Sequence, residues 1–217
     1  ILSEEESILR RWERLIFHLP YAFHAKRIFS ELYQGELERL NKWNDFAAEY
    51  ELSEPKQEDF EQSAAYDKAY ASHLRAITKT PDYRKMVSEK IEKSQRASSH
   101  IGNMYACSIF LALMSSLNAD WEDNADLEGK KLGFFGYGSG SKSKVFEAEV
   151  QPQWKEVVEG FALAKKLEDR VAIDYSTYEN LHRKRLQKSV SQSNGAFALS
   201  EIGEEGVTLG ARYYELK

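Results

Sequence analysis

Residues 132–150 read LGFFGYGSGSKSKVFEAEV, and they contain two candidate β-strands separated by a turn rich in glycine and serine. Leu132–Tyr137 is an apolar run whose glycines allow close approach of a neighbouring backbone, which is typical of a buried strand. Val145–Val150 alternates between apolar and polar residues, as a half-buried strand does. The pattern predicts a β-hairpin whose loop is longer than two residues.

A second buried strand is predicted well before the hairpin, where Leu15–His18 forms a short apolar run. Ser3 and Glu6 are spaced as a capping box, which predicts a helix start ahead of this strand. Pro20 suits the first turn of a helix after it. The charged residues 35–97 have a mostly helical pattern and are expected to cover a surface.

The most apolar segment lies in the middle of the chain. Ile101–Leu117 is apolar nearly all round and rich in small side chains, which predicts an interior helix. Ser98 and Ser99 precede it and are candidate caps. Cys107, inside the same run, is expected to be a small core residue rather than a reactive thiol.

Helices and strands continue after the hairpin. Pro152 is expected to start an amphipathic helix, and Ser176 with Glu179 forms another capping box for a helix that ends near Val190. The last 22 residues contain two more candidate strands, Ala196–Ile202 and Val207–Leu216. The sequence therefore predicts a mixed α/β fold with antiparallel strands toward the C-terminus.

Composition narrows the functional classes. Of 217 residues, 42% are hydrophobic and 30% charged, which is typical of a folded globular protein, and the net charge of -5 argues against a nucleic-acid partner. With a single cysteine the chain cannot form an intrachain disulfide, so a reducing, cytoplasmic location is expected. No apolar run is long enough to span a membrane. Ile1 is not an initiator methionine, and we expect the chain to be part of a longer protein.

Three polar residues are candidates for chemistry, and each also has a structural interpretation. His18 follows a buried strand, where α/β sheets tend to hold ligands, although a histidine there can simply bond to backbone. Asn103 lies at the start of the apolar helix, as a cap or as an amide donor to an oxyanion. Ser139 lies among three alternating glycines that could expose backbone N–H groups to a ligand or form a tight turn.

Two charged clusters are expected to be solvated surface. Asp120–Asp126 lacks the alternating spacing of a calcium-binding loop. His182–Arg185 is a short basic stretch of the kind usually found on a helix face in solvent.

Taken together and in order, four segments resemble the hydroxymethylglutaryl-CoA synthase family. They are Phe17–Tyr21, Gly102–Tyr105, Phe135–Gly140 and Gly210–Tyr214, which match its Phe-His-x-Pro-Tyr, Gly-Asn-Met-Tyr, Phe-Ser-Tyr-Gly-Ser-Gly and tyrosine-rich terminal segments. The resemblance covers nearly the whole chain. It implies a thiolase-like, layered α/β/α half-domain over residues 1–217 with a mixed sheet and Met104–Leu117 as its buried central helix.

The resemblance also implies a reaction, in which acetyl-CoA and acetoacetyl-CoA condense to 3-hydroxy-3-methylglutaryl-CoA without a further cofactor. The family's nucleophilic cysteine and catalytic glutamate belong to an N-terminal half outside this chain, so the isolated chain should be inactive. His18 and Asn103 match catalytic positions. The matched substrate-binding positions are Pro20, Tyr21, Lys26, Arg27, Tyr105, Tyr137 and Ser139. A homodimer is expected, with no nucleic acid or membrane partner.

Two positions depart from the family pattern. Gly136 stands where the family usually has serine, and Phe23 where it often has a lysine that meets the CoA phosphates. Lys26 and Arg27, on the neighbouring turn, could replace that lysine. Three alternatives stay open: a polyketide β-branching synthase that uses a carrier protein, a non-catalytic partner subunit, and an unrelated α/β binding module.

Overall fold

The computed structural model describes residues 7–138, 141–186, 190 and 197–216. The chain divides into two compact units, Ile1–Glu168 and Asp169–Lys217. The expectation that residues 1–217 form a single domain of a longer protein stays a prediction. Among the residues described, no helix is both long and apolar enough to cross a bilayer.

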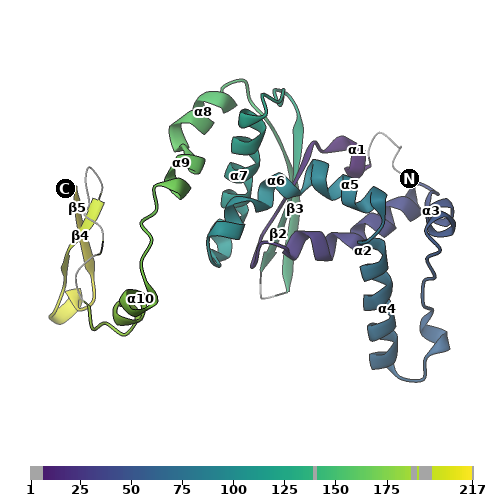
Figure 1. Ribbon diagram of the computed structural model, residues 1–217, viewed down its shortest axis with the longest axis horizontal. Helices are drawn as coiled ribbons and strands as arrows, with labels where there is room; N and C mark the ends of the chain where they lie inside the picture. Colours follow the sequence, from purple (N-terminus) through teal and green to yellow (C-terminus); the bar gives the residue numbers. More distant parts are fainter. Residues whose placement is uncertain (1–6, 139–140, 187–189, 191–196, 217) are drawn as a thin grey trace. The chain divides into compact units, whose positions relative to one another are not determined.

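The first unit is built on a three-stranded sheet in the order β1-β2-β3. The strands are β1 (Arg14–Phe17), β2 (Lys131–Gly138) and β3 (Lys142–Glu149). β1 runs parallel to β2, and β2 pairs antiparallel with β3. The mixed sheet and the hairpin with a loop longer than two residues are therefore confirmed. Because parallel strands need a long crossover, the helices between β1 and β2 connect them around the sheet (Figure 1).

One face of the sheet carries an aromatic cluster. Phe17 of β1 and its partner Phe135 of β2 stack with ring centroids 4.4 Å apart. Phe29, from helix α2 (His24–Arg39), meets both rings edge-on, at 5.8 Å and 6.3 Å. These contacts place α2 over this face.

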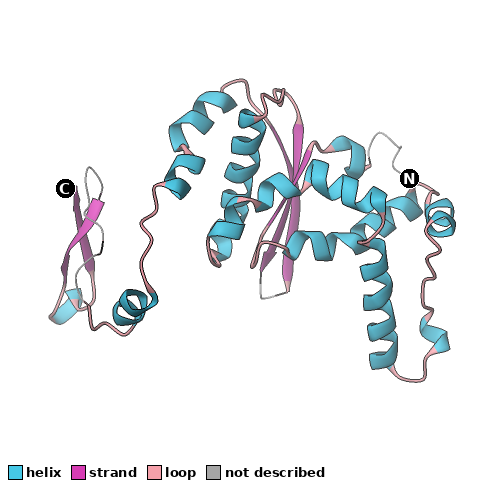
Figure 2. Ribbon diagram, viewed as in Figure 1, coloured by secondary structure: helices cyan, strands magenta, loops and turns pink. Residues whose placement is uncertain are grey.

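The other face is covered by helix α7 (Ser108–Glu122). Side chains alternate along a strand, so Arg14 points away from the side on which Phe17 lies. There its guanidinium bonds in bidentate fashion to Asp120 of α7, at 3.0 Å and 2.6 Å. Lys93 adds a third bond to the same carboxylate, at 2.7 Å. Helices on both faces give the predicted α/β/α layering, with strands between helices in Figure 2.

The remaining helices complete the first unit. They are α1 (Ile8–Arg11), α3 (Trp43–Glu49), α4 (Ser63–Ile77), α5 (Pro81–Lys90), α6 (Glu92–Gln95), α8 (Trp154–Phe161) and α9 (Leu163–Glu168), with 3₁₀ turns η2 (Gln57–Asp59), η3 (Ala97–His100) and η4 (Tyr105–Cys107).

Several predicted helix starts were wrong. α2 begins at His24 rather than near Pro20, which lies in the turn before it. Ser98 and Ser99 lie within η3 and do not cap α7. The Ser3–Glu6 capping box lies outside the described residues, and α1 is instead capped by Ser7, whose hydroxyl accepts from the Leu9 amide at 3.2 Å.

The predicted interior helix is shifted and, within this chain, only partly covered. α7 starts at Ser108, after the 3₁₀ turn η4, because Tyr105 has a φ of 50°, which lies outside the α-helical range. It continues to Glu122, beyond the predicted end at Leu117. Phe110 is 65% exposed, so the helix is not buried on every side.

The second unit contains helix α10 (Tyr175–His182) and an antiparallel pair, β4 (Phe197–Ile202) and β5 (Arg212–Leu216). The two terminal strands are confirmed, although the second is shorter than predicted because η5 (Gly206–Thr208) and a turn precede it.

The capping box predicted for the second unit was wrong. Asp174 caps α10 two residues before Ser176, and its carboxylate accepts from the Thr177 amide at 2.7 Å. The helix also ends at His182, before the predicted end near Val190.

Candidate functional site

His18 lies at the junction of the sheet and α7. Its backbone amide continues the parallel ladder and donates to the Phe135 carbonyl at 2.9 Å. Its ring Nδ1 lies 2.9 Å from the hydroxyl of Ser108, the first residue of α7. The ring is half-buried and bonds to a side chain, so the interpretation of a histidine satisfied by backbone does not account for it.

The hairpin meets the same histidine. Tyr137, near the end of β2, has its ring centroid 6.2 Å from that of His18, and it is 57% exposed. The structure therefore brings together two of the predicted site residues from segments about 120 positions apart. Ser139 lies outside the described residues.

Asn103 is placed in the loop before α7. Its side-chain oxygen accepts from the Tyr105 amide at 2.7 Å, which closes a local turn. The interpretation as a helix cap was wrong, because Cys107 occupies the cap position of α7. Asn103 and Tyr105 are both exposed, and among the described residues neither forms a hydrogen bond with the His18 side chain. Their catalytic and substrate-binding roles stay predictions.

Ser108 is a site residue that sequence reasoning missed. It is 2% exposed, and its hydroxyl accepts from the Leu19 amide at 2.9 Å in addition to meeting His18. Within the run Ile101–Leu117, which is apolar and rich in small side chains, a serine does not stand out. The available signal was its position five residues after Asn103, where a polar side chain opens the helix.

Pro20 and Tyr21 follow the histidine in the turn before α2. Pro20 is half-buried, whereas Tyr21 is exposed and sets its ring edge-on to His24, with centroids 5.0 Å apart. Burial lowers the pKa of His24, and the nearby His18 and Arg27 lower it further. The turn thus places the His24 ring near His18, with the Tyr21 ring against it.

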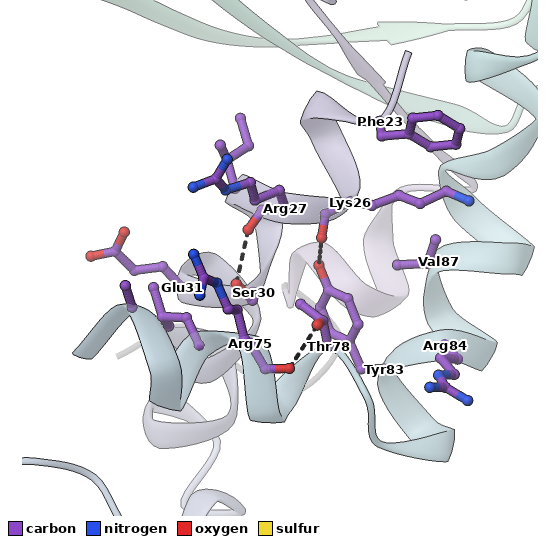
Figure 3. Close-up of a pocket in the computed structure, with 13 residues that line it drawn as sticks. Phe23, Lys26, Arg27, Ser30, Glu31, Arg75, Thr78, Tyr83, Arg84 and Val87 are labelled. Atoms are coloured by element: carbon purple, nitrogen blue, oxygen red, sulfur yellow. Dashed lines mark hydrogen bonds between the residues drawn. The ribbon is translucent and has the colours of Figure 1, made fainter. Parts of the chain in front are cut away.

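Lys26 and Arg27 line a pocket of about 750 Å³ between α2, α4 and α5, with arginines from the other two helices (Figure 3). Lys26 is already paired with Glu92 at 2.7 Å. Arg27, Arg75 and Arg84 make no ion pair with any residue that the structure describes. One carboxylate, Glu31, also lines the pocket, which on balance is basic and suited to an anionic group.

Phe23, which stands where the family often has lysine, lies at the rim of this pocket. The Lys26 ammonium lies 5.6 Å from the centre of the Phe23 ring. A positive charge from the next turn therefore stands beside the position where the family often has lysine. That Lys26 replaces the family's lysine in binding CoA stays a prediction.

Two expectations about charged and thiol residues were wrong. Cys107 is exposed rather than part of the core, because it precedes α7 instead of lying inside it. Asp120 is fully buried rather than solvated, because Arg14 and Lys93 bond to it from distant segments. Within the described part of the chain, no group of three His, Cys, Asp or Glu side chains is arranged to hold a metal ion.

Comparison with known proteins identifies the family. Residues 2–200 match the family model described as hydroxymethylglutaryl-coenzyme A synthase C terminal. A hydroxymethylglutaryl-CoA synthase from Haloferax volcanii is 27% identical over 186 residues, which cover 83% of this chain and 42% of the relative. A relative of the same name from Saccharomyces cerevisiae is 25% identical over 182 residues, covering 82% of this chain and 34% of the relative.

The fold also matches solved structures. MvaS in complex with 3-hydroxy-3-methylglutaryl coenzyme A superposes with a TM-score of 0.66 at 22% identity, covering 95% of this chain and 42% of MvaS. PksG, a HMG-CoA synthase from Bacillus subtilis, superposes with a TM-score of 0.61 at 16% identity, covering 98% of this chain and 45% of PksG. This chain spans less than half the length of these proteins. It belongs to the hydroxymethylglutaryl-coenzyme A synthase family, of which it represents the C-terminal part.

Proposed function

We propose that the complete protein containing this chain condenses acetyl-CoA with acetoacetyl-CoA to give 3-hydroxy-3-methylglutaryl-CoA. The observation that carries the proposal is the half-buried His18, held at a strand end by Ser108 and flanked by Tyr137. Family membership supports it, since the Haloferax relative is named for this synthase.

The chain's part in the reaction is to bind and polarise the acceptor. The methyl carbon of an acetyl group held on a cysteine of the N-terminal half loses a proton to the glutamate expected in that half and attacks the ketone of acetoacetyl-CoA, and the alkoxide formed takes up a proton. Water then cleaves the thioester to the cysteine, which releases 3-hydroxy-3-methylglutaryl-CoA and the free thiol. His18 is proposed to hydrogen-bond the acetoacetyl thioester, with Asn103 completing the polar site. Tyr105, Tyr137 and Ser139 would enclose the acyl group, next to Pro20 and Tyr21.

The basic pocket is the proposed contact for the CoA phosphates. Arg27 lines this pocket and has no ion-pair partner among the described residues, whereas the charge of Lys26 is partly neutralised by Glu92. Planar guanidinium groups bind phosphate oxygens in bidentate fashion. We therefore assign Arg27 the larger share of phosphate binding.

The N-terminal half of the enzyme is the proposed partner for the exposed apolar side chains near the site. Met104, Tyr105 and Phe110 are 37%, 77% and 65% exposed at the start of α7. A partner that covers them would exclude water from the reacting groups. The complete protein is proposed to be cytoplasmic and to form a homodimer. Sedimentation of the purified protein would test the dimer.

The decisive experiment separates two steps in the complete protein carrying His18→Ala. If His18 binds the acceptor, acetyl-enzyme formation from acetyl-CoA should persist while overall condensation falls about a hundredfold, the scale of one positioned polar group. Equal loss in both steps would instead make His18 the base that activates the thiol. Absence of any acetyl adduct in the wild-type protein would favour a non-catalytic subunit.

A second candidate differs only in the acyl carrier. The fold matches both MvaS and PksG, so the likeness does not separate them. Condensation rates with acetyl groups on CoA and on a carrier protein would decide. A strong preference for the carrier protein would place this chain with the polyketide β-branching synthases.

A further inference from the structure

The hydroxyl of Ser108 joins two groups that both belong to the segment after β1. The Leu19 amide lies 2.9 Å from Oγ, and Nδ1 of His18 lies 2.9 Å from the same atom. Both Ser108 and Leu19 are 2% exposed, so water does not compete for these bonds. One oxygen therefore fixes both the backbone that follows the histidine and the ring itself.

Counting protons decides the direction of each bond. A hydroxyl donates one proton and accepts up to two, whereas a backbone amide only donates. The Leu19 amide therefore takes up one acceptor site of Ser108. If the His18 ring also donated through Nδ1, the hydroxyl proton would be left without an acceptor among the described residues. A buried donor without a partner is costly, so the hydroxyl proton is directed to Nδ1.

We propose that Ser108 is a positioning residue that holds His18 in the neutral tautomer protonated at Nε2. In this tautomer Nδ1 is the acceptor of the Ser108 hydroxyl and Nε2–H is a donor. Among the described residues Nε2 has no hydrogen-bond partner, so it is available to a ligand.

The tautomer determines what His18 can do in the reaction. A protonated Nε2 can donate to a carbonyl oxygen, as a polarised thioester requires, and it has no lone pair with which to accept a thiol proton. This consequence rests on the proposed function, whereas the tautomer assignment rests on the geometry alone.

The tautomer can be measured directly in the complete protein with ¹⁵N-labelled histidine. At about pH 8, above the ordinary histidine pKa of about 6.5, the two ring nitrogens of neutral imidazole have distinct chemical shifts. The signal of His18 is assigned by its loss in His18→Gln. The expected result is a protonated Nε2 and an unprotonated Nδ1. A protonated Nδ1 in the wild-type protein would overturn the proposal whatever the variants do.

Variants of Ser108 test the cause. Ser108→Ala should convert the His18 signal to a mixture of tautomers, and Ser108→Thr, which keeps a hydroxyl, should restore the wild-type pattern. Ser116→Ala is the matched control, because Ser116 is a buried serine of the same helix whose hydroxyl has no partner among the described residues. It should leave the signal unchanged. An unchanged tautomer in folded Ser108→Ala would also overturn the proposal.

Kinetics separate this proposal from the proposed function. In Ser108→Ala the KM for acetoacetyl-CoA should rise and condensation should fall about tenfold, the scale of one lost hydrogen bond, while acetyl-enzyme formation persists. A protein without condensing activity that still shows the predicted tautomer would contradict the proposed function and leave the role of Ser108 intact. Condensing activity with the opposite tautomer would support the proposed function and contradict the role of Ser108.

Discussion

Replacing Gly133 with alanine should destabilise the sheet strongly, because the position has no room for a side chain. Gly133 lies in β2 under the indole of Trp12. A Cβ atom there would overlap Cε3 and Cδ2 of Trp12 and would lie 2.7 Å from Cζ3. The indole cannot move freely, since its Nε1 donates to Glu147 at 2.7 Å and its ring meets Phe135 edge-on at 5.6 Å.

The expected loss follows from these contacts. Overpacking a well-packed core costs roughly 1–3 kcal/mol. If the indole shifts, its hydrogen bond to the Glu147 carboxylate is lost, at roughly 1.5–3 kcal/mol for a bond to a charged group. Alanine regains roughly 0.5–1 kcal/mol over glycine inside a strand. The free energy of unfolding should therefore fall by about 3 kcal/mol in Gly133→Ala.

Gly136→Ala is the matched control on the same strand. Its Cβ would meet the Lys144 carbonyl oxygen at 3.6 Å, an ordinary contact, so stability should change by less than about 1 kcal/mol. The measurement is urea unfolding of each protein followed by circular dichroism. Combining Gly133→Ala with Trp12→Ala should cost less than the sum of the two single changes. Equal losses for both glycines, or strict additivity with Trp12→Ala, would refute the reasoning.

Three further predictions concern charges. Asp120→Asn should lower the free energy of unfolding by roughly 3–5 kcal/mol, as for a broken buried ion pair. The exposed Asp123, which also pairs with Lys93, is the control, and Asp123→Asn should cost far less; similar losses in urea titrations would contradict this. Hydrogen bonds from Arg11, Trp12 and Lys131 hold the pKa of Glu147 far below its usual value. The ionised carboxylate therefore stabilises the fold fully above about pH 4.3, and this stabilisation is lost on acidification. Glu147→Gln should flatten the loss of unfolding free energy at acid pH, and an unchanged dependence of stability on pH would count against this. In the complete protein, Arg27→Ala should raise the KM for acetoacetyl-CoA about tenfold and more than Lys26→Ala does, and the reverse order would argue against the phosphate assignment.

The strands and the position of His18 could be predicted because their signals are local. β1 and β2 are short apolar runs, and β2 has glycines where neighbours approach closely. Because β1 has four buried residues and His18 follows them, the histidine is expected at the carboxyl end of that strand. The order of the motifs then indicated the family, which the match to residues 2–200 confirms.

Other features depend on contacts between distant segments, and sequence reasoning failed there. Asp120 belongs to an acidic stretch that looks solvated, but Arg14 reaches it from 106 positions away and buries it. The start of α7 depends on the backbone conformation of Tyr105, a residue type with no preference for positive φ. A helix that is apolar on all sides is expected to be buried, but its sequence does not show which segment covers each side. In this chain Phe110 of α7 is exposed.

The position of His18 links the stability of the sheet to the geometry of the site. Its backbone bonds to Phe135 of β2 and its ring to Ser108 of α7, so strand register and helix placement must agree for both bonds to form. A slip of one residue between β1 and β2 would turn the histidine to the opposite face. The fit of Trp12 over Gly133 opposes such a slip, because only glycine leaves room for the indole. Gly133→Ala should therefore disturb the His18 tautomer signal in whatever fraction stays folded, whereas Gly136→Ala should leave it intact.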